Sequence, residues 1–272
     1  MEFVDLGTGE RGRGLGLVFP GWKRGETVAF LSPHDDDVVL GAGYLVQAVK
    51  KHGGTPVVLI FCRGDAGYSR AKDKRAIVGR RRRETRAAYG ALGVPPEDIV
   101  RFDLPDLSLM AHVDRVTPGG GKGVVEDLIR VLRSRRAGRV VFSSAHCENW
   151  DHTAVHHLGM YAAPQAGDPI LADLGAPWPV STGLVYAVWG DFAPRPGRAL
   201  RADLGVLAGD KDERAVREAL AAFGSQAAIM ANTAAGGRDA RRGPDGWLEL
   251  YRRADVRRPV NYGAYFRELK RS

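Results

Sequence analysis

The sequence has few cysteines that could cross-link it and few long apolar segments that could anchor it in a membrane. Only two of its 272 residues are cysteines, Cys62 and Cys147, and they stand far apart. Two isolated cysteines do not make a disulfide framework, and a chain of this length buries a sizeable core without one. The sequence also lacks a run of about 18 apolar residues and the apolar N-terminal stretch of a signal peptide. These absences predict a cytoplasmic protein without a membrane span.

The charge of the chain is basic, with 40 Lys and Arg residues against 32 Asp and Glu residues. A basic surface can attract nucleic acid, but here the arginines stand in scattered pairs among acidic residues and without interleaved aromatic residues. We therefore expect no nucleic-acid partner. The composition leaves open whether copies of the chain form a homo-oligomer.

Short apolar segments alternate with segments of helical spacing along most of the chain. Buried strands are predicted at residues 27–32, 56–62, 99–102, 139–143 and 183–188, and helices at 38–51, 77–92, 124–136, 152–161 and 210–229. This alternation predicts an α/β fold, Rossmann-like, whose mostly parallel sheet carries helices on both faces. In such sheets ligands bind at the carboxyl ends of the strands, and we expect the active site there.

No linker or internal repeat divides the chain, so we expect one domain over residues 1–272. Residues 1–26 are Gly-rich and polar, which predicts a leader into the first strand. Residues 231–246 have the composition of a flexible surface loop. Residues 247–269 return to aromatic and apolar content, which predicts a strand and a closing element packed on the core.

An acidic cluster directly follows the first predicted strand. It consists of His34 and three consecutive carboxylates, Asp35, Asp36 and Asp37, with apolar segments on both sides. Adjacent carboxylates repel one another unless a cation lies among them. Histidine and carboxylate are usual zinc ligands, and a second carboxylate nearby can act as the base on a bound water. The pattern therefore predicts a catalytic metal site.

A histidine-rich stretch follows the predicted strand at 139–143 and is the best source of a third metal ligand. It contains His146, His152, His156 and His157. Because four histidines stand together at the carboxyl end of a strand, we expect at least one of them to belong to the metal site rather than all four to serve only the fold. The residues alone leave open which of them binds the metal.

Residues 32–43, SPHDDDVVLGAG, resemble the hallmark of the PIG-L or LmbE-like zinc-dependent de-N-acetylases. These proteins act on N-acetylglucosaminyl groups, and their hallmark is a strand followed by Ala-His-Pro-Asp-Asp-Glu and a Leu-Gly-x-Gly turn. The resemblance implies that His34 and Asp37 are zinc ligands and that Asp36 is the general base. It also implies a small-molecule partner, an amino-sugar substrate.

The third ligand is implied by a second match, to the family's His-Pro-Asp-His motif. Residues 150–152 correspond to its last three positions, which makes His152 the ligand and Asp151 its supporting neighbour. His156 would lie one helical turn beyond His152 and could join it, but a fourth protein ligand would close the site. We therefore expect His156 to serve stability.

Further segments follow the order of the family's weaker motifs. They are FCRGDAG at 61–67, RETRAAYGALG at 83–93, which resembles the family's Arg-x-x-Glu helix, LPD at 104–106 and REALAAFGSQ at 217–226. The resemblance implies substrate-binding roles for Asp65, Arg83 and Asp106, the last at sugar hydroxyls. Plainer roles also fit: Asp106 as a turn cap, Arg83 as one of an exposed helical pair with Glu84, and Asp65 as a solvated loop residue.

The chain departs from the family pattern at three positions. Asp35 replaces the motif proline and would add negative charge at the metal, and Val38 replaces the closing glutamate. Asn149 stands where the family often has a histidine that polarises the substrate carbonyl. That role falls to Asn149 or to His146, or is absent.

These inferences predict a hydrolase that binds one zinc ion per chain and removes the N-acetyl group of an N-acetylglucosaminyl-type sugar or its conjugate. Residues 35–39, DDDVV, also fit the motif of magnesium-dependent haloacid-dehalogenase-like phosphohydrolases, with Asp35 as the nucleophile and Asp37 beside it. Against this alternative, His34 would have no role and no later acid pair supplies magnesium ligands. A second alternative is an inactive sugar-binding protein on the same fold, supported only by the replaced motif positions.

Overall fold

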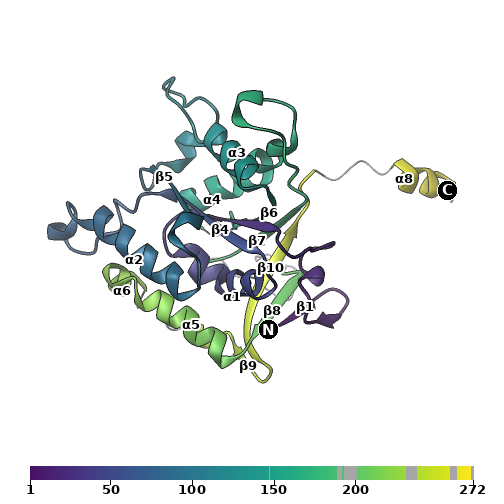
Figure 1. Ribbon diagram of the computed structural model, residues 1–272, viewed down its shortest axis with the longest axis horizontal. Helices are drawn as coiled ribbons and strands as arrows, with labels where there is room; N and C mark the ends of the chain where they lie inside the picture. The colour runs from purple at the N-terminus through teal and green to yellow at the C-terminus, as the bar shows by residue number, and fades with distance from the viewer. Residues whose placement is uncertain (147, 189–191, 193–200, 231–237, 258–261, 271–272) are drawn as a thin grey trace.

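The computed structural model describes residues 1–146, 148–188, 192, 201–230, 238–257 and 262–270. Within these residues, ten strands form one mixed sheet with helices packed against it (Figure 1). The strand order is β2-β1-β8-β10-β7-β6-β3-β4-β5, and β9 pairs with β10.

The strands expected from the apolar runs form the parallel half of the sheet. β3 pairs in parallel with β4 and β6, and β5 and β7 extend the sheet on either side. Their bounds are Thr27–Ser32 (β3), Thr55–Cys62 (β4), Ile99–Leu104 (β5), Ala137–Ser143 (β6) and Thr182–Tyr186 (β7). Their Val, Leu, Ile and Phe content suits strands buried on both faces.

Helices cover both faces of these strands, as Figure 1 shows. Phe30 of β3 lies in one core with α1, α2 and α5, and the next residue, Leu31, lies in the other with α3 and α4. Successive residues of a strand point to opposite faces, which explains this alternation. The helices span Asp37–Lys51 (α1), Ile77–Ala91 (α2), Val125–Ser134 (α3), Trp150–His157 (α4), Asp210–Ala221 (α5) and Ala227–Met230 (α6). The predicted mixed α/β fold with a largely parallel central sheet is confirmed.

An antiparallel extension continues the sheet beyond β7. β10 pairs with β7 through its last residues and with β8 through its first, and β1 lies against β8. The bounds are Glu2–Asp5 (β1), Arg11–Gly12 (β2), Leu204–Ala208 (β8), Arg242–Gly243 (β9) and Gly246–Ala254 (β10). The expectation that residues 1–26 are only a leader was wrong, because β1 is a sheet strand that buries Phe3 completely.

Two expectations for the C-terminal third also need correction. Residues 231–237 of the expected surface loop lie outside the described residues, but Arg238 is only 4% exposed and is part of the interior. The strand expected after residue 247 is β10, whereas the closing element, α8 (Tyr262–Leu269), does not pack on the core. All its described residues are exposed, and Figure 1 shows it apart from the sheet. None of the helices in the described part of the chain is long and apolar enough to cross a bilayer.

Candidate metal centre and pocket

Three side chains expected to bind a metal meet where β3 ends and α1 begins. Asp37, the first residue of α1, accepts a hydrogen bond from the backbone N–H of His34 at 2.7 Å. Its Oδ2 atom lies 3.2 Å from His34 Nδ1 and 3.3 Å from His152 Nε2. One ligand atom from each residue lies within 4.8 Å of the others. The local motif and a residue far along the chain thus form one cluster.

Each histidine of the cluster turns its second ring nitrogen toward another carboxylate. His34 Nε2 lies 3.1 Å from Asp151 Oδ2, and His152 Nδ1 lies 3.0 Å from Glu148 Oε2. Asp151 also accepts hydrogen bonds from the backbone N–H groups of Leu107 and Leu109. A carboxylate behind a histidine fixes the orientation and tautomer of the ring, which is the usual support of a metal-binding histidine.

The charges of the cluster suit a cation. Burial alone would raise the pKa of Asp37, but His152 and His34 hold this pKa well below its usual range. Burial opposes a charged His152, yet Asp37 and Glu148 raise its pKa to about 9. His152 is fully buried, and its Nε2 has no hydrogen-bond partner of good geometry in the described structure. A divalent cation competes with protons for such nitrogens and is stabilised by the same carboxylates, so the donor set fits a metal.

A second group of possible ligand atoms comprises His34, Cys62 and Asp106. Burial raises the pKa of the Cys62 thiol to about 12. A metal binds the thiolate rather than the thiol, so this environment disfavours Cys62 as a ligand.

Asp36 lies beside the cluster. Burial is the largest influence on it and raises its pKa, while Arg81 acts in the opposite direction. Arg81 Nη2 donates to Asp36 Oδ1 at 3.2 Å. A carboxylate with a raised pKa next to a candidate metal site is a better proton acceptor than an ordinary aspartate and is suited to act as a general base.

Asp35 turns away from the cluster, contrary to the expectation that its charge lies at the metal. Its fully buried carboxylate accepts hydrogen bonds from Arg81 Nε at 2.8 Å, from Thr85 Oγ1 at 2.5 Å and from Arg101. Although burial acts in the opposite direction, Arg81 and Arg101 hold the pKa of Asp35 below its usual range. The extra negative charge is therefore neutralised inside the protein.

A pocket of about 290 Å³ opens over the cluster. Its polar lining consists of His34, Asp36, Asp37, Arg81, Asp106, Asn149 and Gln226. Its apolar lining includes Leu40, Leu107, Val188, Ile229 and Met230. A few convergent polar groups against an apolar wall are typical of small-molecule sites, and this volume is near the lower end of their range.

Comparison with known proteins assigns this region to a family. Residues 29–163 match the family model of the GlcNAc-PI de-N-acetylases, PIG-L. The chain belongs to the PIG-L family. The matched segment includes the whole cluster, from His34 to His152. No curated protein sequence matches the chain.

Solved structures share the fold over most of the chain. The conserved protein TT1542 from Thermus thermophilus superposes with a TM-score of 0.67 at 21% identity, over 86% of this chain and 97% of its own. The N,N'-diacetylchitobiose deacetylase from Pyrococcus horikoshii, solved with an inhibitor, has a TM-score of 0.63 at 17% identity, over 84% of this chain and 83% of its own.

A third similar structure has another activity. GalB from Pseudomonas putida, a 4-carboxy-2-hydroxymuconate hydratase, has a TM-score of 0.56 at 17% identity, over 87% of this chain and 99% of its own. At such identities these likenesses show the fold alone. The activity of this PIG-L protein must therefore be argued from its site.

The other expected site residues of the PIG-L region lie at different distances from the pocket. Asp106 lines it and accepts hydrogen bonds from the backbone N–H groups of Gly64 and Ala66 at 2.7 and 3.0 Å. Asp65 is not among the lining residues, and its Oδ1 accepts from Asp106 N–H at 2.9 Å. Asp65 thus fixes the loop that presents Asp106.

Asn149 lines the pocket and also begins α4. Its Oδ1 accepts hydrogen bonds from the backbone N–H groups of Asp151 and His152 at 2.9 and 3.2 Å, as an N-cap residue does. The helix start that carries the third candidate ligand is therefore held by a residue at the pocket wall.

The remaining candidates are not brought to this pocket. His146 and His156 line a separate hollow, and His156 Nδ1 lies 3.0 Å from the Ser143 carbonyl oxygen. His157 is exposed and stacks on Tyr161. Arg83 is exposed on α2 and does not line the pocket.

Two residues that the sequence analysis did not single out lie at the PIG-L site. Arg81 contacts both Asp35 and Asp36, and it stands three residues before Glu84. Strict use of the family's Arg-x-x-Glu spacing points to Arg81 rather than Arg83. Glu148, whose carboxylate lies next to His152, belongs to none of the motifs recognised in the sequence, so no motif could have identified it.

Proposed function

We propose that the chain is a zinc-dependent deacetylase that removes the N-acetyl group of an N-acetylglucosaminyl-type amino sugar or its conjugate. The observation that carries this proposal is the cluster of His34, Asp37 and His152 beside Asp36, inside the PIG-L segment. Three protein ligands next to an open pocket suit catalytic zinc, whereas a structural zinc site has four.

The position of the cluster supports the same proposal. His34 follows β3, Asp106 follows β5, and His152 follows β6, so the pocket gathers residues from the carboxyl ends of three strands of the parallel half. We describe the parallel half as Rossmann-like, with its active site at the edge where such sheets bind ligands.

In the proposed reaction, His34, Asp37 and His152 would hold zinc, and the ion would supply polarisation of the amide carbonyl and a lowered pKa for the attacking water. Asp36 accepts the proton of the attacking water and returns it to the leaving amine. The contact from Arg81 keeps the Asp36 carboxylate directed at the pocket. Asp151 and Glu148 keep the two imidazole rings in place.

The rest of the pocket orients the substrate. Asp106 and Arg81 offer an acceptor and donors to sugar hydroxyls. Asn149 Oδ1 is used in capping α4, so its amide nitrogen is the group that can polarise the acetyl carbonyl. His146 lies at another hollow, which favours Asn149 for this role. The apolar wall limits the access of water.

The magnesium phosphohydrolase alternative is less consistent with this geometry. Its nucleophile would be Asp35, whose carboxylate is fully buried and bound by Arg81, Arg101 and Thr85. A carboxylate with both oxygens occupied cannot reach a phosphate in the pocket.

Metal analysis combined with product analysis tests the proposal. The purified protein should contain about one zinc per chain, and it should release acetate from members of a panel of N-acetylglucosaminides. Chelation should abolish the release, and added zinc should restore it. Metal-free protein with activity unchanged by chelation would overturn the proposal. Phosphate release that requires magnesium would favour the phosphohydrolase, and hydration of an unsaturated acid would favour the activity of GalB.

A further inference from the structure

A larger hollow adjoins the candidate active site. Its volume is about 700 Å³, against about 290 Å³ for the pocket over the metal cluster. Leu40 of α1 and Val188, just after β7, line both pockets. The two hollows therefore share a wall, and a ligand in one can extend toward the other.

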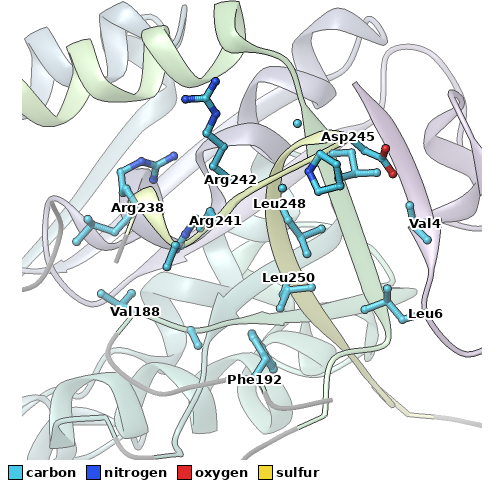
Figure 2. A pocket seen from close by; sticks show the side chains of 18 of the residues that line it. Val4, Leu6, Val188, Phe192, Arg238, Arg241, Arg242, Asp245, Leu248 and Leu250 are labelled. Carbon is cyan, nitrogen blue, oxygen red and sulfur yellow. The ribbon is translucent and has the colours of Figure 1, made fainter. Parts of the chain in front are cut away.

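The larger pocket has an apolar side and a basic side. Figure 2 shows Val4 and Leu6 toward one side and Arg238 and Arg241 toward the other, with Leu248 and Leu250 of β10 between them. Leu248 and Leu250 flank Glu249, which points to the opposite face of the strand, into the protein. The charged lining residues are four arginines and one acid, Arg11, Arg238, Arg241, Arg242 and Asp245, so the lining is suited to a ligand that is partly apolar and carries negative charge.

Arg238 is buried but not fully paired. Only 4% of the residue is exposed. It forms an ion pair with Glu213, and its Nη2 also donates to Tyr44 Oη at 2.9 Å. Its Nη1 is buried without a hydrogen-bond partner in the described structure. One donor group is therefore unused on a residue that lines the pocket.

Arg241 is more exposed than Arg238, with 25% of its side chain accessible, but it also has an unused donor. Its Nη1 is also buried without a hydrogen-bond partner among the described residues, and Glu249 Oε2 is 3.8 Å away. Glu249 already accepts hydrogen bonds from the N–H groups of Tyr44 and Leu45 and from the Tyr251 hydroxyl. Burial, and then the positive charge of Arg238, lower the pKa of Arg241 below its usual range. Glu249 therefore offsets part of the Arg241 charge but gives its Nη1 no hydrogen bond.

Unsatisfied buried donors are costly, and two on arginines that line the same pocket need an explanation. An oxyanion accepts hydrogen bonds from two guanidinium groups at once. We propose that this pocket is an anion-binding subsite, in which Arg238 and Arg241 hold a carboxylate or phosphate on the part of the substrate beyond the amino sugar. The link to a substrate rests on the proposed deacetylase function. The anion site itself rests on the two arginines.

The first experiment compares a neutral N-acetylglucosaminide with glycosides that carry a carboxylate or a phosphate on linkers of increasing length. For the best linker, KM should be about 10-fold lower than for the neutral glycoside, with a similar kcat, because a contact remote from the reacting bond contributes uniform binding. In Arg241→Gln the ratio of the two KM values should return to about 1. The control, Arg214→Gln, removes an exposed arginine of α5 and should keep the preference.

Arg241 is the better target of the two arginines. Glu249 keeps its hydrogen bonds from Tyr44, Leu45 and Tyr251 when Arg241 is replaced, whereas replacing Arg238 would leave Glu213 without its buried cationic partner. Thermal melting of Arg241→Gln checks that the variant is folded. The carboxylate and phosphate glycosides show which of the two anions the subsite prefers.

A second measurement does not depend on turnover. Inorganic phosphate and acetate are titrated into the wild type, Arg241→Gln and Arg214→Gln by calorimetry. The proposal expects the affinity for at least one anion to fall about 10-fold or more in Arg241→Gln only. Equal affinities in the two variants would overturn it. If neutral and anionic glycosides are deacetylated with equal KM, the subsite proposal fails and the deacetylase stands; if no glycoside is deacetylated but the affinity falls, the deacetylase fails and the anion site stands.

Discussion

Glu249 of β10 accepts hydrogen bonds from the backbone N–H groups of both Tyr44 and Leu45, each at 3.1 Å. These groups lie just beyond a break in α1, where Ala42 has the non-helical angles φ −142° and ψ 19°. A side-chain acceptor at such a break acts as a cap does at the start of a helix. The antiparallel half of the sheet is thereby tied to the helix whose first residue is Asp37.

The first prediction separates the roles within the acidic cluster. Asp37→Asn should lose zinc, because it removes the charge of a ligand. Asp36→Asn should keep zinc and lose about 100-fold or more in kcat, the usual contribution of a general base. Elemental analysis and acetate release check both variants. Exchanged phenotypes would mean that Asp36 is the ligand and Asp37 the base.

The second prediction concerns the histidines after β6. His152→Ala should abolish zinc binding and activity together, since its Nε2 faces Asp37. His156→Ala is the matched control on the same helix, and it should retain zinc and mainly lower the melting temperature, because its ring contacts the Ser143 carbonyl. His146→Ala should also retain zinc. Full zinc occupancy in His152→Ala would refute the assignment of the third ligand.

The third prediction tests the carboxylate behind His152. Glu148→Gln should weaken zinc binding by about 10- to 100-fold, because it no longer holds the imidazole by its charge. Competition with a chromogenic chelator measures the change. Glu97→Gln, at an exposed glutamate away from the cluster, is the control. Equal zinc affinity in both variants would show that Glu148 has no role in metal binding.

The fourth prediction concerns the buried ion pair of Asp35. Asp35→Asn should lower the free energy of unfolding by about 3–5 kcal/mol, because Arg81 and Arg101 lose their buried partner. Asp239→Asn, at a carboxylate that is 73% exposed, should cost less than about 1 kcal/mol. Urea unfolding measures both. A folded Asp35→Asn of wild-type stability that has lost a phosphatase activity would instead identify Asp35 as a nucleophile.

The fifth prediction is a pH dependence at β1. Hydrogen bonds from Thr8 and Gly7 and the contact with Arg253 lower the pKa of Asp5 from 3.8 to about 2. A lowered carboxyl pKa stabilises the folded state above the unfolded pKa, and this contribution is lost as the pH falls toward 2. The wild type should therefore exceed Asp5→Asn in stability at pH 7, and the difference should shrink below about pH 4. Urea midpoints between pH 3 and 7 check this, and a constant difference would contradict it.

The parts of the fold that the sequence predicts are those with a strong local signal. The parallel strands are continuous apolar runs, and the segment from β3 into α1 is a contiguous motif. β1 has only two buried residues, Phe3 and Val4, within a Gly-rich stretch, and its partner β8 lies far along the chain, at Leu204–Ala208. A strand this short, paired with a distant segment, has no hydrophobic pattern long enough to predict it from the sequence.

In the candidate site, too, the features that a local motif determines could be predicted, and those that depend on distant residues could not. His34 and Asp37 are three residues apart at the start of a helix, so their spacing in the sequence is enough to place their side chains close together. The direction of Asp35 depends on Arg81 and Arg101, which come from other elements, and no motif contains all three. α8 shows the opposite case: its apolar spacing is that of a packed helix, although all of its described residues are exposed.

The distance along the chain between His34 and His152 has a consequence for folding. A metal held by both would close a loop that contains β4, β5 and β6, and would restrict the unfolded chain as a long-range covalent bridge does. In a chain with two cysteines that stand far apart, zinc would then be the main cross-link. Zinc would stabilise the native sheet as a whole, and its removal would lower the melting temperature of regions far from the pocket, including β1.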